Sequence, residues 1–368
     1  MKARTWATMS VVLALVLTAC GGADTADTTT AAAETTTTTP ETTTTVAETT
    51  TTTEAMSTVG TPDNPIKVLF VPSAEAAIIV TGGELMAEAL NEATGLTYEV
   101  IVPTDYSATI EEMCASPENT MGFIPGAAYV EASALCGVDV AFKAVRFGWP
   151  VYWAQILVPR DSDITSIEDL EGKSWAFPDA GSTSGFRVPS LMFSEAGVTP
   201  GEQVEAGGHT QAALAVYNGE VDFATTFYSP PLLPDGNWDE TMAPELADDI
   251  IETCGPNEEG DKLVCGTDGE YRILDARSSA RTDAPDIMQK VKILAISPGI
   301  PNDTLSFGPD FPSDVRAQIE AALVAFAGTD AWNESIGNQD FYGWTGIEAA
   351  TDDEYDGLRK IEELLADE

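Results

Sequence analysis

The sequence predicts an α/β protein of two lobes, each an open, mainly parallel β-sheet flanked by helices. Two observations carry this prediction. Short apolar stretches alternate with longer amphipathic stretches from Ile66 onward, which is the rhythm of βαβ units. About 300 of the 368 residues follow the N-terminal tail, and a single compact core seldom holds so many.

The first lobe is expected over residues 61–157, with more of it from 297 to 368. Apolar strands are predicted at 66–71, 98–102 and 121–124, with helices at 75–93, 106–114 and 127–135. Ligands of such sheets bind at the carboxyl ends of the strands. The loops that follow these strands, with Ser73 and Tyr106 among them, are therefore candidate binding loops.

The second lobe is expected over residues 158–296. The apolar run 151–159 is predicted to be a strand that crosses into it, and further strands are expected at 174–177, 221–226 and 291–296. Residues 230–267 contain many turn residues and little periodicity, which indicates an insertion. Helices at 312–327 and 352–366 complete the returning part of the first lobe.

The N-terminus is predicted to be an export signal, over residues 1–19. Lys2 and Arg4 precede an apolar core too short to span a membrane, and the segment ends Leu-Thr-Ala-Cys-Gly, as in a bacterial lipobox. Lipid on Cys20 then anchors the protein to the outer face of the cell membrane. An ordinary signal peptide with a chance cysteine is the alternative. The Thr-rich stretch to about residue 60 predicts a disordered linker.

The charge balance is strongly acidic, with 17 basic residues against 60 acidic ones and a formal net charge of −43. This excess indicates a solvated surface and argues against a nucleic acid partner. A chain this negative does not gather anions by its general field. Any anion site must therefore be a local arrangement of directed donors.

Four cysteines follow Cys20, and an even number in an exported protein predicts two disulfides. Three pairings are possible, and we favour the local ones, Cys114 with Cys136 and Cys254 with Cys265. The second would close a weakly patterned acidic stretch. A zinc site is the alternative, but neither C-x₂-C spacing nor a second histidine supports it. No metal or cofactor is expected.

The pattern that points most directly to binding is Gly-Ser-Thr-Ser-Gly at 181–185, between a strand and a helix. Ser182, Thr183 and Ser184 lie where a helix exposes unpaired N–H groups, so hydroxyls, amides and helix dipole together suit an oxyanion. A plain helix cap is the alternative, although a cap needs only one such residue. His209, the only histidine, follows two glycines at another expected helix start. A structural histidine is its alternative.

Asp303, Tyr106 and Tyr152 are further candidates. A carboxylate beside a bound anion repels it unless the ligand keeps a proton to donate, so Asp303 would select monoprotonated oxyanions. A simple turn is the alternative. Tyr106, Tyr152 and Trp153 are candidates to wall a cleft, with tyrosine hydroxyls as donors, although aromatic residues of this kind are more often core.

Three motifs of catalytic or metal sites are present only in incomplete form. A G-x-S-x-G nucleophile elbow needs serine at 183, where the chain has threonine. Gly172-Lys-Ser lacks the earlier glycine of a P-loop. A calcium loop near 352–363 is spoiled by Glu354 and Arg359. We therefore expect no enzyme, and a Ser/His hydrolase is a remote alternative.

Four blocks resemble the phosphate, phosphite and phosphonate substrate-binding proteins of ABC importers. They are Asn64–Ser73, Ala180–Gly185, Gly207–Asp222 and Ile300–Asp303. The resemblance implies a two-lobed periplasmic-binding-protein fold of the two-crossover type, with the ligand cleft between the lobes. It also implies partnership with an ABC permease and its ATPase, and a monomer is expected.

Carried over by motif, the resemblance implies that Ser182, Thr183, Ser184 and His209 bind phosphoryl oxygens. Tyr106 is a matching aromatic, Asp303 an acceptor and Tyr152 a weaker match. After Thr226 the chain reads Phe-Tyr-Ser-Pro-Pro, where phosphonate binders of this family can carry an acidic residue suited to an aminoalkyl tail. The expected ligand is therefore small: phosphite, phosphate or an alkylphosphonate. A sulfonate or a thiamine-precursor pyrimidine on the same scaffold is the alternative.

Overall fold

A computed structural model describes residues 58–366, and all of them fall in one compact unit. The predicted signal peptide, the predicted lipid site at Cys20 and the Thr-rich stretch up to residue 57 lie outside the described residues. Within the described part, no helix is long and apolar enough to cross a membrane.

The first sheet has six strands in the order β15-β4-β14-β3-β1-β2. The β1 strand pairs in parallel with β2 and β3, whereas β14 and β15 join the sheet antiparallel to their neighbours. We call the part of the chain around this sheet the first lobe. Its strands are β1 (Ile66–Phe70), β2 (Tyr98–Ile101), β3 (Thr120–Ile124), β4 (Asp139–Val145), β14 (Thr304–Phe307) and β15 (Gly346–Ala349).

Local sequence explains the helices of the first lobe. The first helix buries Ile79, Met86 and Leu90 on one face and ends at Gly95, whose φ of +73° suits glycine best. The second helix is capped by Asp105, whose side chain accepts the N–H of Ala108 at 2.7 Å. The helices are α1 (Ala76–Thr94), α2 (Tyr106–Ala115), α3 (Gly126–Cys136), α8 (Ser313–Phe326) and α9 (Asp330–Glu334).

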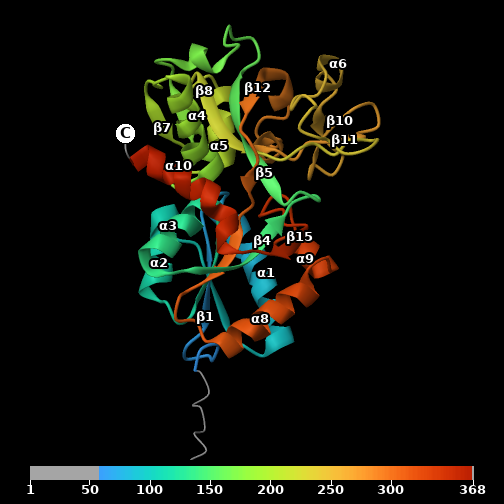
Figure 1. The fold of residues 1–368 in the computed structure, drawn as a ribbon. Coiled ribbons are helices and arrows are strands. Elements are labelled where there is room, and N and C mark those ends of the chain that lie inside the picture. Colours follow the sequence, from blue (N-terminus) through green and yellow to red (C-terminus); the bar gives the residue numbers. More distant parts are fainter. Residues whose placement is uncertain (1–57, 367–368) are drawn as a thin grey trace, which may run out of the picture. The chain divides into compact units, whose positions relative to one another are not determined.

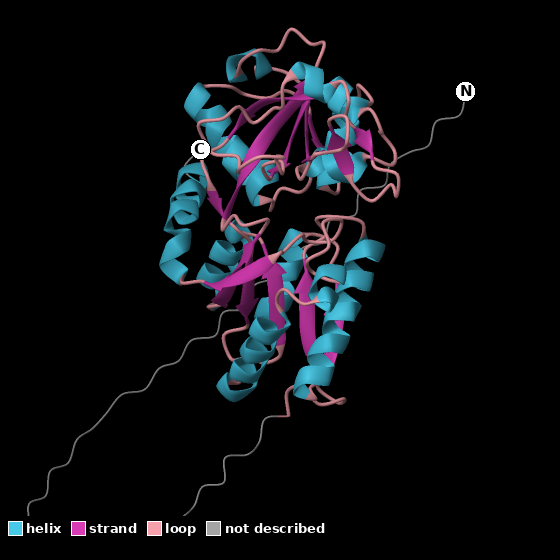
Figure 2. Ribbon diagram, turned by 90° about the vertical axis from the view of Figure 1, so that its right-hand side faces the viewer, coloured by secondary structure: helices cyan, strands magenta, loops and turns pink. Residues whose placement is uncertain are grey.

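The second sheet runs β12-β5-β8-β6-β7, with β13 also paired to β5. We call its surroundings the second lobe, and Figure 2 shows helices on both sides of each sheet. The strands are β5 (Val151–Pro159), β6 (Trp175–Phe177), β7 (Gln203–Glu205), β8 (Phe223–Tyr228), β12 (Val291–Ile296) and β13 (Ile300–Pro301). The helical elements are η1 (Ile167–Leu170), the π-helical turn η2 (Thr183–Arg187), α4 (Val188–Ala196), α5 (His209–Tyr217), η3 (Ala276–Ala280) and α7 (Ile287–Lys290).

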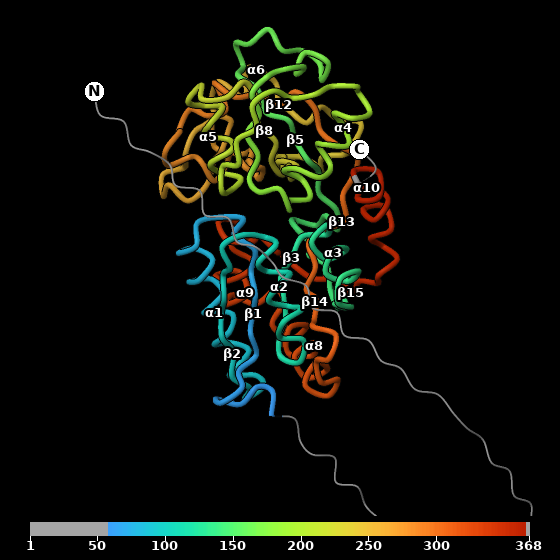
Figure 3. The backbone as a smooth tube through the Cα atoms, turned by 90° about the vertical axis from the view of Figure 1, so that its left-hand side faces the viewer, coloured from blue at the N-terminus to red at the C-terminus, as the bar shows by residue number. Residues whose placement is uncertain are grey.

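Two expectations about the sheets need correction. Both sheets are mixed rather than mainly parallel, because strands that arrive from the other lobe enter antiparallel to their neighbours. The predicted lobe boundary at 157–158 falls inside β5, all of which belongs to the second sheet. The chain instead passes between the lobes from β4 to β5 and back from β13 to β14, and β13 lies at that junction in Figure 3.

Residues 230–267, expected as a turn-rich insertion, contain short elements of their own. A four-residue helix, α6 (Asp248–Ile251), precedes the strands β9 (Gly255–Pro256) and β10 (Leu263–Cys265), and β11 (Tyr271–Arg272) completes a three-stranded antiparallel sheet. This small sheet lies beside the second lobe (Figure 1). The two local disulfides are confirmed, Cys114 with Cys136 and Cys254 with Cys265.

The last helix contacts both lobes. The η4 turn (Asp352–Tyr355) leads into α10 (Asp356–Ala366), which packs against α3 of the first lobe and α4 of the second. Arg187, at the end of η2, pairs with Glu362 of α10 at 3.2 Å and with Glu131 of α3 at 3.9 Å. In Figure 1 this red helix runs upward alongside the junction of the lobes.

Candidate functional site

A cavity of about 80 Å³ lies between the two lobes, with room for several water-sized groups. Seven of the eight predicted ligand-binding residues line it. From the first lobe these are Ser73, Tyr106 and Asp303, and from the second Tyr152, Ser182, Ser184 and His209.

The Ser-Thr-Ser loop is built by a turn that closes on itself. Ser182 Oγ accepts the N–H of Gly185 at 3.1 Å, which caps η2. Ser182 and Ser184 are buried and line the cavity. Gly181 lies so close to the first lobe that a Cβ there would stand 2.7 Å from Cβ of Tyr106. Glycine at 181 therefore lets the loop approach Tyr106 across the cleft.

The Thr183 hydroxyl contacts the first lobe. Its Oγ1 accepts the N–H of Ala127, in the first turn of α3, at 2.9 Å, and Thr183 is absent from the residues that line the cavity. The hydroxyl thus joins the second lobe to the first.

Asp179 is a further bridge between the lobes that sequence reasoning missed. It accepts the N–H of Gly181 at 2.6 Å within its own loop and the N–H of Tyr106 at 3.4 Å across the cleft. Burial is the main cause that raises the pKa of this carboxyl above its usual range. Asp179 therefore ties the predicted oxyanion loop to the start of α2.

His209 begins α5 with only 6% of its surface exposed, and its ring lies 5.1 Å from that of Phe227. Burial, and to a lesser degree the positive charge of Arg146, lowers the pKa of His209 to about 3. The imidazole is therefore neutral at physiological pH. Its Nδ1 is buried and has no hydrogen-bond partner among the described residues. The neutral ring thus lines the cavity with one of its nitrogens unpaired within residues 58–366.

Arg146 pairs with Asp303, a contact that no pattern in the sequence predicts. Its Nη2 lies 2.5 Å from Asp303 Oδ2, its Nη1 donates to Asn302 Oδ1 at 2.7 Å, and its Nε donates to the carbonyl of Tyr342 at 3.0 Å. Asp303 is therefore not a lone carboxylate in the cavity. The pair has no net charge, which weakens the repulsion that Asp303 alone would exert on an anion.

Tyrosine hydroxyls surround this pair. Tyr106 and Tyr152 are buried, and desolvation raises the pKa of each, with Asp303 adding to the shift. The hydroxyls of Ser184 and Thr183 act on Tyr152 in the opposite direction. Both phenols therefore stay protonated and serve as neutral donors. Trp153, the other aromatic candidate, packs against Trp149 and does not line the cavity.

Another part of the cavity wall, which we call the far end, is formed by η3 and by the loop before β15, whose Tyr342 carbonyl also accepts from Arg146. Gln339 donates to Ser278 Oγ at 2.9 Å and accepts from Arg272 Nη2 at 2.5 Å. Both carboxylate oxygens of Asp340 accept from Arg281, at 2.8 and 2.6 Å. The amide, the carboxylate and one hydroxyl at this end are therefore already paired within the protein.

The arrangement suits the binding of a small molecule. Between residues 58 and 366 no group of three or more His, Cys, Asp or Glu side chains is placed to hold a metal ion. Neutral donors from both lobes converge on a small enclosed space, and a molecule held there contacts both lobes at once. Two lobes with the ligand space between them define the class of solute-binding proteins that close around their cargo.

Comparison with known proteins gives the family within that class. Residues 68–355 match the family described as "ABC transporter, phosphonate, periplasmic substrate-binding protein". The chain belongs to this family, as the resemblance of its four sequence blocks implied.

Curated relatives share parts of the chain. The phosphate-import protein PhnD of Mycolicibacterium smegmatis is 29% identical over 235 residues, which cover 60% of this chain and 64% of that protein. The phosphonates-binding periplasmic protein of Escherichia coli is 36% identical over 85 residues, 21% of this chain and 25% of that one. The chain thus spans less than two thirds of the length of either relative.

Solved structures share the fold. A binding-protein component of an ABC phosphonate transporter from Pseudomonas aeruginosa has a TM-score of 0.60 at 18% identity, covering 81% of this chain and 85% of that one. PhnD1 from Prochlorococcus marinus, in complex with methylphosphonate, also has a TM-score of 0.60, at 13% identity, covering 82% and 98%. At these identities the likeness concerns the fold.

Proposed function

We propose that this protein captures a small phosphorus oxyanion outside the cytoplasm and delivers it to an ABC permease. The ligand class is phosphite, phosphate or an alkylphosphonate such as methylphosphonate. The protein performs no covalent chemistry: it binds between its lobes, closes and releases.

The observation that carries the proposal is the set of neutral donors at one end of the cavity. His209 lines the cavity in its neutral form, and Ser184 and Tyr106 line it with their hydroxyl-bearing side chains. An anion bound by neutral dipoles in a buried site avoids the cost of adding an unpaired charge of either sign. Asp303 Oδ2 is taken by Arg146, and no hydrogen bond within residues 58–366 engages Oδ1. Oδ1 would accept the proton of a monoprotonated ligand.

The far end of the cavity supports a small ligand. The polar groups of Gln339 and Asp340 are engaged by Arg272 and Arg281, and the ion pair of Asp340 with Arg281 has no net charge to attract a cationic tail. An aminoalkyl group there would lose its water without gaining a partner. Short alkyl substituents fit better, because Phe147, Phe227 and Phe341 also line the space.

The setting of this activity is also a proposal. The predicted lipid on Cys20 and the Thr-rich linker would hold the protein at the outer face of the membrane, near its permease. The permease and its ATPase would supply the transport, and the binding protein would act as a monomer.

A thermal-shift and calorimetry panel tests the proposal on the purified protein, with phosphite, phosphate, methylphosphonate, 2-aminoethylphosphonate and taurine. Saturating binding raises the melting temperature, since a ligand that binds only the folded state adds RT ln(1 + [L]/Kd) to stability. We expect a shift with at least one of the first three and none with taurine, which has no acidic proton on its sulfonate at neutral pH. The absence of any shift with phosphorus oxyanions would contradict the proposal.

A further inference from the structure

The polar network at the far end of the cavity joins the two lobes. Arg281 follows η3 in the second lobe, and Asp340 belongs to the loop between α9 and β15 in the first lobe. Their side chains form a bidentate ion pair, Nη1 to Oδ1 at 2.8 Å and Nη2 to Oδ2 at 2.6 Å. Paired hydrogen bonds of this kind fix direction as well as distance.

The ion pair is shielded from water mainly on the arginine side. The Arg281 side chain is 8% exposed and that of Asp340 is 33% exposed. Arg281 also donates to the carbonyls of Ser278 and Gly260, at 2.9 and 3.0 Å, so the second lobe holds its guanidinium in place. The guanidinium is therefore ready to receive a carboxylate from the first lobe.

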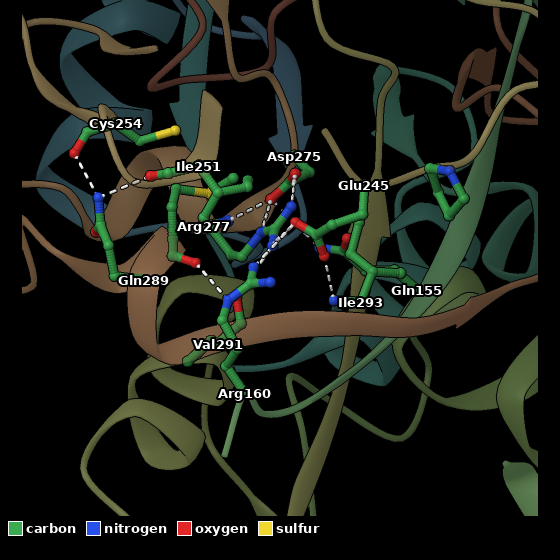
Figure 4. Close-up of polar contacts among 12 residues, drawn as sticks. Gln155, Arg160, Glu245, Ile251, Cys254, Asp275, Arg277, Gln289, Val291 and Ile293 are labelled. Atoms are coloured by element: carbon green, nitrogen blue, oxygen red, sulfur yellow. Dashed lines mark hydrogen bonds and ion pairs between the residues drawn. The ribbon is translucent and has the colours of Figure 1, made fainter. Parts of the chain in front are cut away.

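Segment 230–267 is hydrogen-bonded to arginines near both ends of η3. Arg277, in the first turn of η3, donates to Glu245 of this segment at 2.9 Å. Arg281, directly after η3, donates to the carbonyl of Gly260 in the same segment. Figure 4 shows Arg277 between Glu245 and Asp275, and its side chain is only 2% exposed. Breaking one partner of so buried a pair is costly, so η3 has little freedom to move away from the segment.

The disulfide secures the part of the segment that carries Gly260. Cys254 and Cys265 flank the β9–β10 hairpin, and the turn between its strands contains Gly260. Within that turn the N–H of Gly260 donates to the carbonyl of Asn257 at 3.0 Å. The carbonyl that faces Arg281 is thus held by a closed loop.

We propose that Arg281 and Asp340 form a clasp that exists only while the lobes are closed, and that segment 230–267 braces it. This inference rests on the proposed binding function. It makes the two residues positioning residues: the clasp slows opening and so retains the ligand. Both Asp340 oxygens are used by Arg281, so the clasp stabilises the closed state without depending on which ligand is inside.

The consequence is a specific kinetic signature. A contact that favours only the closed state raises the closed fraction, and the apparent affinity scales with that fraction. Losing it should speed dissociation while leaving association and the ranking of ligands unchanged. A change in ligand contacts would instead alter the ranking.

The test compares wild type with Asp340→Asn and Arg281→Gln, by stopped-flow tryptophan fluorescence and calorimetry with methylphosphonate, phosphite and phosphate. We expect dissociation about tenfold faster or more in each variant, because charge pairs across an interface carry couplings of that size or larger. Association should stay within about threefold. Asp340→Asn is the safer variant for folding, since Asp340 is partly exposed, and a cooperative unfolding curve verifies both.

Asp139→Asn is the matched control, because Asp139 pairs with Arg316 at 2.5 Å wholly within the first lobe and the charge change is the same. It should dissociate ligand like wild type. Dissociation in Asp340→Asn no faster than in Asp139→Asn would overturn the clasp. Cys254→Ser with Cys265→Ser tests the brace: faster dissociation supports it, and an unchanged rate overturns that part.

Failure of the proposed function is distinguishable. If wild type binds none of the anions, that function is wrong, and small-angle scattering of the ligand-free protein then decides on the clasp. Asp340→Arg, which sets two cations face to face, should enlarge the radius of gyration. A ligand-free wild type as compact as the closed structure, together with an unchanged radius in Asp340→Arg, would overturn the clasp.

Discussion

Two arginine–aspartate pairs lie at the same cavity and have different surroundings. Arg146, Asp303 and Asp340 line the cavity, and Arg281 pairs with Asp340. Arg146 and Asp303 both belong to the first lobe, at the ends of strands that neighbour each other in its sheet. Arg281 and Asp340 come from different lobes. The first pair therefore persists however the lobes move, whereas the second requires them to be together.

The difference separates the roles that one kind of contact can play. We call the part of the cavity that holds His209, Ser184 and Asp303 the binding end. The Arg146 pair neutralises the charge of Asp303 there, which would otherwise repel an anion. The Arg281 pair contributes nothing to that end and ties the walls together. If both proposals hold, the same kind of ion pair shapes the choice of ligand in one place and slows its release in the other.

The largest effect is expected from Arg146→Gln. Asp303 would be left as an uncompensated, largely buried carboxylate beside the ligand, so we expect anion affinity to fall about 100-fold or more and the free energy of unfolding to fall by about 2–3 kcal/mol. Calorimetry and urea unfolding measure these. The double variant Arg146→Gln with Asp303→Asn should recover much of the stability, and Arg316→Gln should bind like wild type. No loss of affinity in Arg146→Gln would show that the pair does not control the binding end.

A smaller effect should distinguish the two ends by their hydroxyls. Ser184→Ala removes a buried hydroxyl at the binding end, and a lost hydrogen bond of this kind costs about 1–1.5 kcal/mol, or roughly tenfold in affinity. Ser279→Ala, at the far end, should change affinity less than about twofold. Equal losses in calorimetric affinity would mean that the ligand occupies the whole cavity.

The smallest effect concerns pH and His209. Burial lowers the pKa of His209 from 6.5 to about 3, so between these values the unfolded chain binds a proton that the folded protein does not. With respect to this group, the free energy of unfolding is highest above pH 6.5 and decreases as the pH falls below that value. Relative to His209→Asn, wild type should lose about 1 kcal/mol of unfolding free energy between pH 6.5 and 5.5. Urea unfolding of both proteins at the two pH values measures the difference, and parallel curves would contradict a neutral buried histidine.

Much of the fold could be predicted from local sequence. Gly95, the cap at Asp105 and the apolar strands mark elements by patterns a few residues long. The predicted binding loops could also be recognised, because Ser182 and His209 lie where a glycine-rich turn meets a helix. The mixed sheets could not be predicted, since β14 and β5 take their direction from the crossings between lobes.

The residues of the cavity that sequence reasoning did not predict were overlooked for a physical reason. Arg146 meets Asp303 across 157 positions of sequence, and nothing near Arg146 indicates a carboxylate. The loop that carries Gln339 and Asp340 has no periodicity to place it. The contact of Thr183 with Ala127 also could not be predicted, because it joins two residues 56 positions apart, and the role of Thr183 in ligand binding stays a prediction.

The last helix, α10, limits how the lobes can move. Two chain crossings alone would permit both bending and twisting, as two threads joining two bodies do. Helix α10 packs on α3 and α4 and pairs with Arg187, so it adds a third connection between the lobes. A change in the angle between the lobes must therefore displace α10 or break its contacts with α3, α4 or Arg187.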